Sequence, residues 1–298
     1  MRKFIFRSGA GIALVTLSAI SVFAQAEVKQ STAKAKIIRD IEYGHLSGES
    51  QKLDLYLPET ESTSPVPAMV FVHGGGWVGG DKREYESKAI DLAGRGYVSV
   101  SVNYRMAPKH KFPAAVEDVQ RAVRWLRSHA VEYHVDRRKI ASMGGSAGGH
   151  LATMLGVTDE PGREGDGPVV SSRVLCVVDY YGRMDLTIDP TSDKHEDFRE
   201  RFMGSLPDGN QETLRIYRQA SPLYHVDKLS APMLIVQGGV DQQVEPIQSD
   251  RMFHEMQKMG IKCWYLKLSG QGHGFSGEAA DFAWSSAVTF LRKNFNEK

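Results

Sequence analysis

Residues 144–148 read Gly-Gly-Ser-Ala-Gly and lie where a strand-like run meets a helix-like run within residues 140–152. They contain the pattern Gly-x-Ser-x-Gly. A serine hydroxyl projects from such a junction only when the backbone turns very tightly, and side chains two residues to either side would clash in that turn. In this position the pattern predicts a nucleophile at Ser146. The alternative interpretation is a glycine-rich turn that packs a helix closely on a sheet.

Strand-like and helix-like runs alternate on both sides of this motif. Short apolar runs rich in β-branched residues are typical of strands that are covered on both faces. Such runs occur at 68–72, 97–102, 174–178, 233–236 and 261–265, and an alternating run occurs at 53–57. Apolar residues three and four apart predict helices at 113–126, 252–259 and 280–290. The alternation predicts an α/β fold: a doubly wound, mostly parallel sheet with helices on both faces.

A second glycine-rich motif follows the apolar run that ends at Val72, where residues 73–77 read His-Gly-Gly-Gly-Trp. An oxyanion hole needs backbone N–H groups that point inward with no side chains in the way. We expect Gly75, Gly76 and Ala147 to supply these donors, and His73 to brace the loop through hydrogen bonds. The alternative, a phosphate-binding loop, would need a lysine followed by serine or threonine, and the sequence lacks this pair here.

A serine nucleophile needs a base and an acid that orients it, and in this kind of fold they follow in the order acid, then histidine. Asp241 comes just after the apolar run 233–236, at the sheet edge where the serine turn is expected. His273 lies on a loop between two glycines, which suits an imidazole that must reach Ser146. Glu245 is the alternative acid, and Asp185 is a weaker one.

One long stretch, residues 187–221, does not fit the alternation. It is charged and contains proline, yet its aromatic residues argue against full disorder. We interpret it as an insertion that forms a small cap near the active site. Together with this insertion, Trp77, Tyr180 and Tyr181 are the candidates for shaping the substrate pocket.

The charge of the chain is nearly balanced, with 37 basic and 36 acidic residues among 298, of which 41% are hydrophobic. This size and composition suffice for one sizeable buried core. Balanced charge argues against nucleic acid or an anionic membrane surface as a general partner, because both require an excess of lysine and arginine on one face. The histidines outside the motifs show no metal-ligand spacing, and we expect no metal or organic cofactor.

The first 26 residues differ from the rest. Arg2, Lys3 and Arg7 precede a run without charge at 8–23, and Ala-Gln-Ala follows at 24–26. This order is typical of a secretory signal peptide, and we expect cleavage after Ala26 and a periplasmic or extracellular location. The apolar run is shorter than the roughly 20 residues of a membrane-spanning helix, so we expect no stable membrane anchor.

Two cysteines, Cys176 and Cys263, lie inside apolar runs that we interpret as strands. A disulfide requires Cα atoms within about 7 Å, whereas adjacent strands lie ~4.8 Å apart and the next ones twice as far. We therefore expect two buried free thiols.

Several motifs form a set that can be compared with known families. They are residues 73–77, 103–108 (Asn-Tyr-Arg-Met-Ala-Pro), 112–114 (Phe-Pro-Ala), 117–118 (Glu-Asp), 144–150, Asp241 and 272–275 (Gly-His-Gly-Phe). The set resembles the hormone-sensitive-lipase-like α/β hydrolases, and within them the bacterial carboxylesterases related to acetylxylan and feruloyl esterases. The resemblance spans about residues 53–290. It implies an eight-stranded, mostly parallel sheet and hydrolysis of short-acyl carboxylic esters. One departure is Gln237-Gly238, where relatives often have His-Gly.

These observations predict a secreted serine esterase in which Ser146 attacks the ester, His273 acts as base and Asp241 orients it. The expected substrate is a small ester, and export together with the resemblance favours an acylated plant polysaccharide or a related carbohydrate ester. Two alternatives stay open. A serine peptidase or amidase could use the same three residues, because fold and triad do not choose the bond that is cleaved. The other alternative is a non-catalytic binding module on a hydrolase scaffold.

Overall fold

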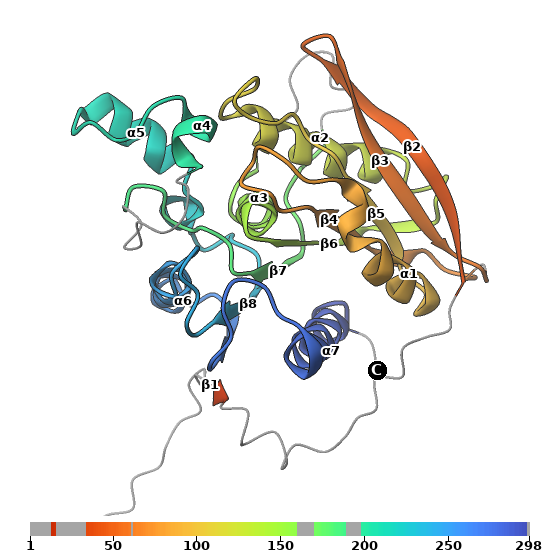
Figure 1. Ribbon diagram of the computed structural model, residues 1–298. Helices are drawn as coiled ribbons and strands as arrows, with labels where there is room; N and C mark the ends of the chain where they lie inside the picture. Colours follow the sequence, from red (N-terminus) through yellow and green to blue (C-terminus); the bar gives the residue numbers. More distant parts are fainter. Residues whose placement is uncertain (1–12, 16–33, 61, 160–169, 189–197, 297–298) are drawn as a thin grey trace, which may run out of the picture.

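A twisted sheet runs through the middle of the protein, with helices on both of its faces (Figure 1). This computed structural model describes residues 13–15, 34–60, 62–159, 170–188 and 198–296. Within them the strands are hydrogen-bonded in the order β1-β9-β8-β7-β6-β4-β5-β3-β2. Their bounds are β1 Ala13–Val15, β2 Ala35–Leu46, β3 Glu49–Pro58, β4 Val66–Val72, β5 Val98–Val102, β6 Val135–Gly145, β7 Cys176–Tyr180, β8 Met233–Gly238 and β9 Cys263–Leu268.

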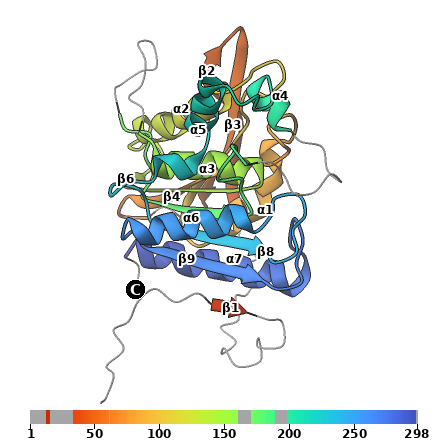
Figure 2. The same ribbon diagram turned by 90° about the vertical axis from the view of Figure 1, so that its left-hand side faces the viewer.

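The eight strands β2 to β9 form the mostly parallel sheet that the sequence predicts. Only β3 runs antiparallel to its neighbours, β2 and β5, and the other paired strands in the described residues are parallel. Figure 2 shows β8 and β9 at one end of the sheet and β2 and β3 at the other. The three-residue β1 pairs with β9 at the edge. It belongs to the predicted signal peptide, and the other residues of that segment lie outside the described residues.

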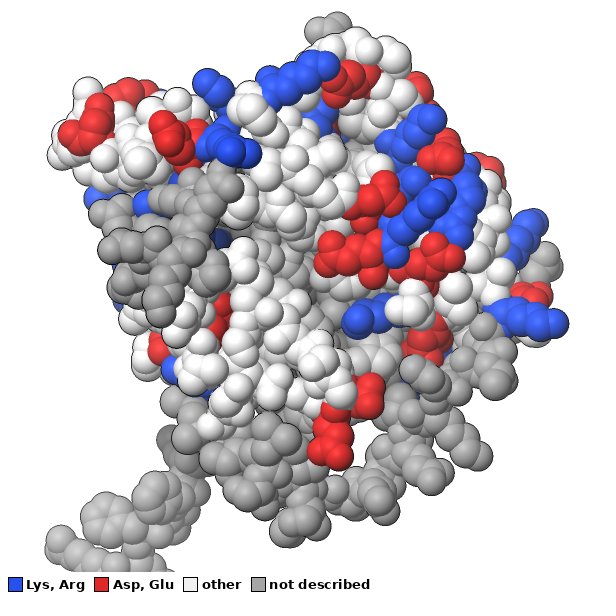
Figure 3. Space-filling model, in the orientation of Figure 1, with Lys and Arg blue, Asp and Glu red and all other residues white. Residues whose placement is uncertain are grey.

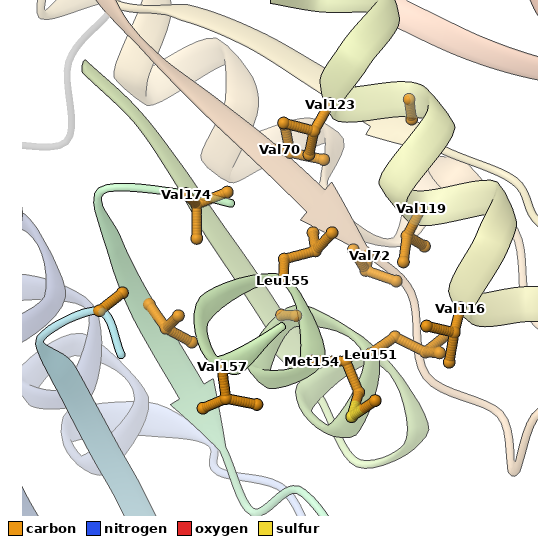
Figure 4. Packing of buried hydrophobic residues seen from close by; sticks show 14 of the residues in the cluster. Val70, Val72, Val116, Val119, Val123, Leu151, Met154, Leu155, Val157 and Val174 are labelled. Atoms are coloured by element: carbon orange, nitrogen blue, oxygen red, sulfur yellow. The ribbon is translucent and has the colours of Figure 1, made fainter. Parts of the chain in front are cut away.

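Helices cover the sheet in two layers, each with its own apolar core. On one face lie α2 (Ala114–Ser128), α3 (Ala147–Val157) and α6 (Ile247–Lys258), and on the other lie α1 (Glu86–Gly94) and α7 (Gly277–Asn294). Strand β4 shows why its sequence is continuously apolar: its side chains alternate between the two cores. Figure 4 shows Val70 and Val72 of β4 packed against residues of α2 and α3.

The described part of the predicted cap segment, 187–188 and 198–221, contains two short helices, α4 (Arg199–Met203) and α5 (Gln211–Gln219). Residues 189–197 of that segment lie outside the described residues. The segment is tied to the rest of the protein through Phe202, whose carbonyl accepts the amide of Phe112 at 2.8 Å and whose ring stacks on Trp77. Short 3-10 helices precede α1 (η2, Lys82–Tyr85) and follow α5 (η3, Pro222–His225).

The two thiols are free and buried, as the sequence predicts. Cys176 lies on β7 and Cys263 on β9, and β8 separates these two strands. Burial raises the pKa of both thiols, so they stay protonated.

On the face shown in Figure 3, acidic and basic side chains are interspersed rather than gathered by sign. Among the described residues, no helix combines the length and the apolar character required to cross a bilayer.

The parallel strands position the site. Because parallel strands end at the same edge of a sheet, the loops that follow β4, β6, β8 and β9 meet there. These loops carry residues 73–77, Ser146, Asp241 and His273, respectively.

Candidate active site

Ser146 occupies a strained turn between β6 and α3, with φ of 56° and ψ of −122°. Its amide donates to the carbonyl of Tyr180 at 2.9 Å, which fixes the turn to β7. A Cβ added at Gly144 would lie 2.2 Å from the carbonyl oxygen of Gly148, and one at Gly148 would lie 2.1 Å from that of Val72. Both contacts are impossible, so the turn requires the two glycines of the Gly-x-Ser-x-Gly pattern.

The glycine loop after β4 is equally constrained. Gly75 and Gly76 have φ of 100° and 59°, a region that favours glycine. The carbonyl of Gly75 accepts the amides of Val78 and Gly79, both at 3.0 Å, which closes the loop tightly. The amide of Gly74 donates to the Glu84 carboxylate at 3.0 Å. Because this amide is occupied, the predicted donors of the loop are those of Gly75 and Gly76.

His73 braces this loop, as its sequence position suggests. Its Nδ1 lies 2.8 Å from the carbonyl oxygen of Gly74, and its ring stacks on Tyr104 with centroids 4.3 Å apart. Burial lowers the pKa of His73, although the hydrogen bond to Gly74 and the charge of Asp81 oppose this. A neutral imidazole that donates from Nδ1 fits this position.

At the other side of the site, His273 and Asp241 form a hydrogen-bonded pair, with Nδ1 2.9 Å from Oδ2. The other carboxylate oxygen of Asp241 accepts the amides of Gln243 and Val244, both at 2.9 Å. Burial raises the pKa of Asp241, but the hydrogen bond and charge of His273 and the two amides outweigh it. The pKa therefore lies below its ordinary value, and the group is a carboxylate at neutral pH.

Gln237, the residue at which this sequence departs from the resembled pattern, supports the same carboxylate. It is fully buried at the end of β8, and its Nε2 lies 3.2 Å from Oδ2 of Asp241 and 3.1 Å from the carbonyl oxygen of Val244. Its Oε1 accepts the hydroxyl of Ser249 at 2.8 Å. This departure from the family pattern thus keeps the Asp241 turn closed with a neutral side chain.

The alternative acids take no part in this pair. Asp185 forms an ion pair with Arg251 at 2.6 Å and accepts the amide of Thr187. Glu245 lies past the Asp241 turn, and the hydrogen bond of His273 goes to Asp241 rather than to it.

Two pockets adjoin Ser146, and they share Gly76, Ser146, Phe198 and Gln243. The wide pocket, about 370 Å³, is lined in addition by Gly74, Gly75, Glu84, Gly145, Tyr181 and His273. The narrow pocket, about 30 Å³, is lined in addition by Trp77, Ala147, Arg183, Arg199 and Val244. Ser146 therefore lies between the two pockets, with His273 in the wide one and Ala147 in the narrow one.

Of the three residues that the sequence suggests for substrate contact, two line these pockets. Tyr181 lines the wide one, and its ring centroid lies 4.7 Å from that of His273. Trp77 lines the narrow one, and its Nε1 donates to Nδ1 of His150 at 3.1 Å. Burial lowers the pKa of His150 to about 4, so its ring is a neutral acceptor at Nδ1.

Tyr180 is the exception, because it lines neither of the two pockets. Its ring is buried and packs against those of Tyr181 and Phe275. It acts on the site through its backbone, since its carbonyl holds the amide of Ser146. Tyr180 is the last residue of β7, whereas Tyr181 follows it in a turn with φ of 43°, and only the ring of Tyr181 reaches the wide pocket.

Sequence reasoning missed four pocket residues that lie outside the motifs and the predicted cap segment: Glu84, Arg183, Gln243 and Val244. Each lies on a loop or short helix, where no periodic pattern marks a side chain that faces inward. Proximity to a motif is the one signal available, for Gln243 lies two residues after Asp241. Among the described residues, no group of three or more histidine, cysteine, aspartate or glutamate side chains could hold a metal ion.

The sequence of this chain is similar to that of known hydrolases. The model of the BD-FAE family matches residues 53–256. The esterase LipC of Mycobacterium tuberculosis (strain ATCC 25618 / H37Rv) is 35% identical over 76% of this chain and 57% of LipC. The probable carboxylic ester hydrolase LipM of the same strain is 32% identical over 79% of this chain and 56% of LipM. The chain thus spans a little over half the length of these relatives.

Among solved structures, a thermophilic esterase of the Planctomycetes species Thermogutta terrifontis, Est2 with propionate bound, is similar over most of both chains. The TM-score is 0.73 at 26% identity, covering 89% of this chain and 95% of Est2. Together with the sheet order, this similarity confirms the α/β-hydrolase fold.

Proposed function

This chain belongs to the BD-FAE family, and from that premise we propose that it is a serine carboxylesterase for short-acyl esters. The observation that carries the proposal is the pairing of His273 with Asp241 at 2.9 Å in a pocket that Ser146 also lines. The names of its relatives, esterase and carboxylic ester hydrolase, support the same reaction.

The proposed reaction proceeds by double displacement. His273 takes the hydroxyl proton of Ser146 as the oxygen attacks the ester carbonyl, and Asp241 holds the imidazole in the tautomer that can accept it. The tetrahedral oxyanion accepts hydrogen bonds from the amides of Gly75, Gly76 and Ala147. His273 then protonates the leaving alcohol as the acyl-enzyme forms. Water attacks this acyl-enzyme along the reverse path and releases the acid.

The two pockets divide the substrate between them. The leaving alcohol must lie within reach of His273, which lines the wide pocket, so the alcohol portion occupies that pocket. The acyl group remains on Ser146 and extends toward Ala147 and the narrow pocket. A volume of about 30 Å³ leaves room for only a few heavy atoms, which favours acetyl and similarly short acyl groups. The propionate bound to the related Est2 agrees with this size.

We further propose that residues 1–26 direct export and that the natural substrate is an acylated carbohydrate. The charged, apolar and small-residue order of these residues supports export. The mature chain would begin at Glu27 and act in the periplasm or outside the cell.

The test is hydrolysis of 4-nitrophenyl acetate, followed by labelling with a fluorophosphonate probe. We expect the wild-type protein to turn over the ester and to be labelled at Ser146, and Ser146→Ala to lose both with an unchanged circular dichroism spectrum. A matching amino-acid anilide should be hydrolysed far more slowly than the ester. Faster cleavage of the anilide would favour a peptidase, and retained turnover in Ser146→Ala would disprove the assigned nucleophile.

A further inference from the structure

The wide pocket contains one carboxylate that the reaction does not use, Glu84 of the 3-10 helix η2. A Cβ built on Gly74 would lie 3.7 Å from Cβ of Ser146 and 3.8 Å from Oε1 of Glu84. Those two atoms are therefore at most about 7.5 Å apart. Glu84 is solvent-exposed, so its side chain is accessible to whatever enters the pocket beside the nucleophile.

The charge of Glu84 is held in place but not neutralised by an ion pair. Its Oε2 accepts the amide of Gly74 at 3.0 Å, which directs the carboxylate toward the glycine loop. Among the described residues, Glu84 forms no ion pair with a lysine or arginine. Lys88 of α1, whose charge acts on Glu84, lies over the rings of Tyr85 and Trp284, at 5.7 and 5.8 Å from their centroids.

The pKa of Glu84 lies above its ordinary value, because the effect of burial exceeds that of the hydrogen bonds from Gly74 and Tyr85 and of the charge of Lys88. Measurement at pH 8, well above the ordinary carboxyl pKa of about 4.3, favours the ionised form.

This carboxylate faces the alcohol portion of the substrate. The alcohol must lie in the wide pocket because His273, which protonates it, lines that pocket. Glu84 lines the same pocket and is absent from the narrow one, where the acyl group lies. A fixed negative charge in a partly enclosed site attracts cations and hydrogen-bond donors, and it repels anions.

We propose that Glu84 is a specificity-determining residue that selects esters by the charge of their alcohol portion, favouring hydroxyl-bearing and cationic alcohols over anionic ones. The inference rests on the proposed esterase function, whose alcohol side it defines. Discrimination of this kind works largely by repulsion, because an anionic alcohol would meet a carboxylate that forms no ion pair among the described residues.

The test uses three acetate esters whose para substituents are anionic, neutral and cationic: 4-acetoxybenzoate, its methyl ester and 4-acetoxy-N,N,N-trimethylanilinium. Values of kcat/KM at pH 8 are measured for the wild-type protein and for Glu84→Gln, which keeps an acceptor for the amide of Gly74. The intrinsic reactivity of each ester cancels when the two proteins are compared on the same substrate. We expect the cation-to-anion ratio of kcat/KM to fall roughly three- to tenfold in the variant.

The matched control is Glu86→Gln, which removes the same charge two residues along the chain. The Glu86 carboxylate pairs with Arg39 at 2.7 Å and does not line the wide pocket. We expect the cation-to-anion ratio to stay at the wild-type value in this control. A third variant, Glu84→Ala, removes the acceptor of the Gly74 amide as well, and it should slow all three esters together in addition to shifting the ratio.

The outcomes separate the two proposals. If the wild-type protein hydrolyses the esters but the ratio is unchanged in Glu84→Gln, the role of Glu84 is wrong and the esterase function stands. An equal shift in Glu86→Gln would also overturn it, because the effect would then come from the net charge of the protein. If the wild-type protein hydrolyses none of the three esters, the proposed esterase function is wrong, and so is the role of Glu84 that rests on it.

Discussion

The two sides of the site are held by different forces. On the nucleophile side, residues 73–77 and 144–148 are fixed by backbone conformation, with positive φ angles and glycines that leave no space for a Cβ. On the acid side, His273 bonds to Asp241, and Asp241 also accepts hydrogen bonds from the Gln237 side chain and from the amides of Gln243 and Val244. The nucleophile side therefore depends mainly on backbone turns, and the acid side depends mainly on the hydrogen bonds of one carboxylate.

This difference governs how each side responds to substitution. An added methyl group in a closed backbone turn displaces the main-chain donors, and no rotamer change can relieve it. A lost side-chain hydrogen bond leaves the backbone in place, and it alters the orientation and charge of the catalytic groups. Substitutions on each side test this contrast directly.

The largest effect is expected on the acid side, for Asp241→Asn. The amide cannot stabilise an imidazolium, and it can hold His273 in the wrong tautomer, so kcat should fall by a factor on the order of 10⁴. Steady-state hydrolysis of 4-nitrophenyl acetate measures this loss. Asp185→Asn is the control, because Asp185 pairs with Arg251 away from His273, and it should keep kcat within a few-fold of wild type. A comparable loss in both variants would contradict the assignment of Asp241.

On the nucleophile side, Gly75→Ala should lower kcat by a factor on the order of 10², because a displaced loop loses an oxyanion donor. The new Cβ would lie 2.3 Å from the carbonyl oxygen of Gly79, at a φ of 100°. Gly96→Ala is a matched control: Gly96 has φ of 88°, but no atom lies within 4 Å of the new Cβ. It carries the backbone strain without the clash. Equal kcat values in the two variants would show that the loop tolerates the added atom.

The same contrast explains what the sequence predicts and what it does not. The nucleophile side can be recognised in the sequence, because its tight turn requires glycines that lie within two residues of Ser146. Asp241 and His273 were identified by their order after the serine and by the strands before them. Their support from Gln237 and Ser249 is invisible in sequence, because the bond joins residues of β8 and α6 whose pairing depends on the fold.

The fold follows the same rule. Strands that are buried on both faces, such as β4, can be predicted from their continuous apolar runs. The edge strand β2 went unpredicted because among its 12 residues only Tyr43 is buried, so neither an apolar run nor a clean alternation is present. Glu84 and Phe198 line the pockets from short, irregular segments, for which no periodicity exists.

A smaller effect is expected for Gln237→Leu, which removes the amide that holds Oδ2 of Asp241 and leaves the Ser249 hydroxyl without its acceptor. We expect kcat to fall by roughly tenfold and the free energy of unfolding by about 1–3 kcal/mol, the usual cost of stranding buried polar groups. Gln237→His keeps a neutral ring N–H that can donate to Oδ2 of Asp241, and it should retain most of kcat. If both variants behave alike, Gln237 only fills space.

The smallest effect concerns acid stability. The pKa of Asp241 is lower in the folded protein than its ordinary value of 3.8, so the folded state binds a proton at this carboxylate less readily than the unfolded state. The resulting stabilisation is fully present above the unfolded pKa and is lost as pH falls through the folded pKa. Urea unfolding of the wild-type protein and Asp241→Asn, repeated between pH 6 and pH 3, isolates this contribution. The difference in free energy of unfolding between the two proteins should be constant above pH 5 and shrink below pH 4. A difference that grows on acidification would mean that burial, rather than the hydrogen bonds of His273, Gln243 and Val244, dominates the energy of this carboxylate.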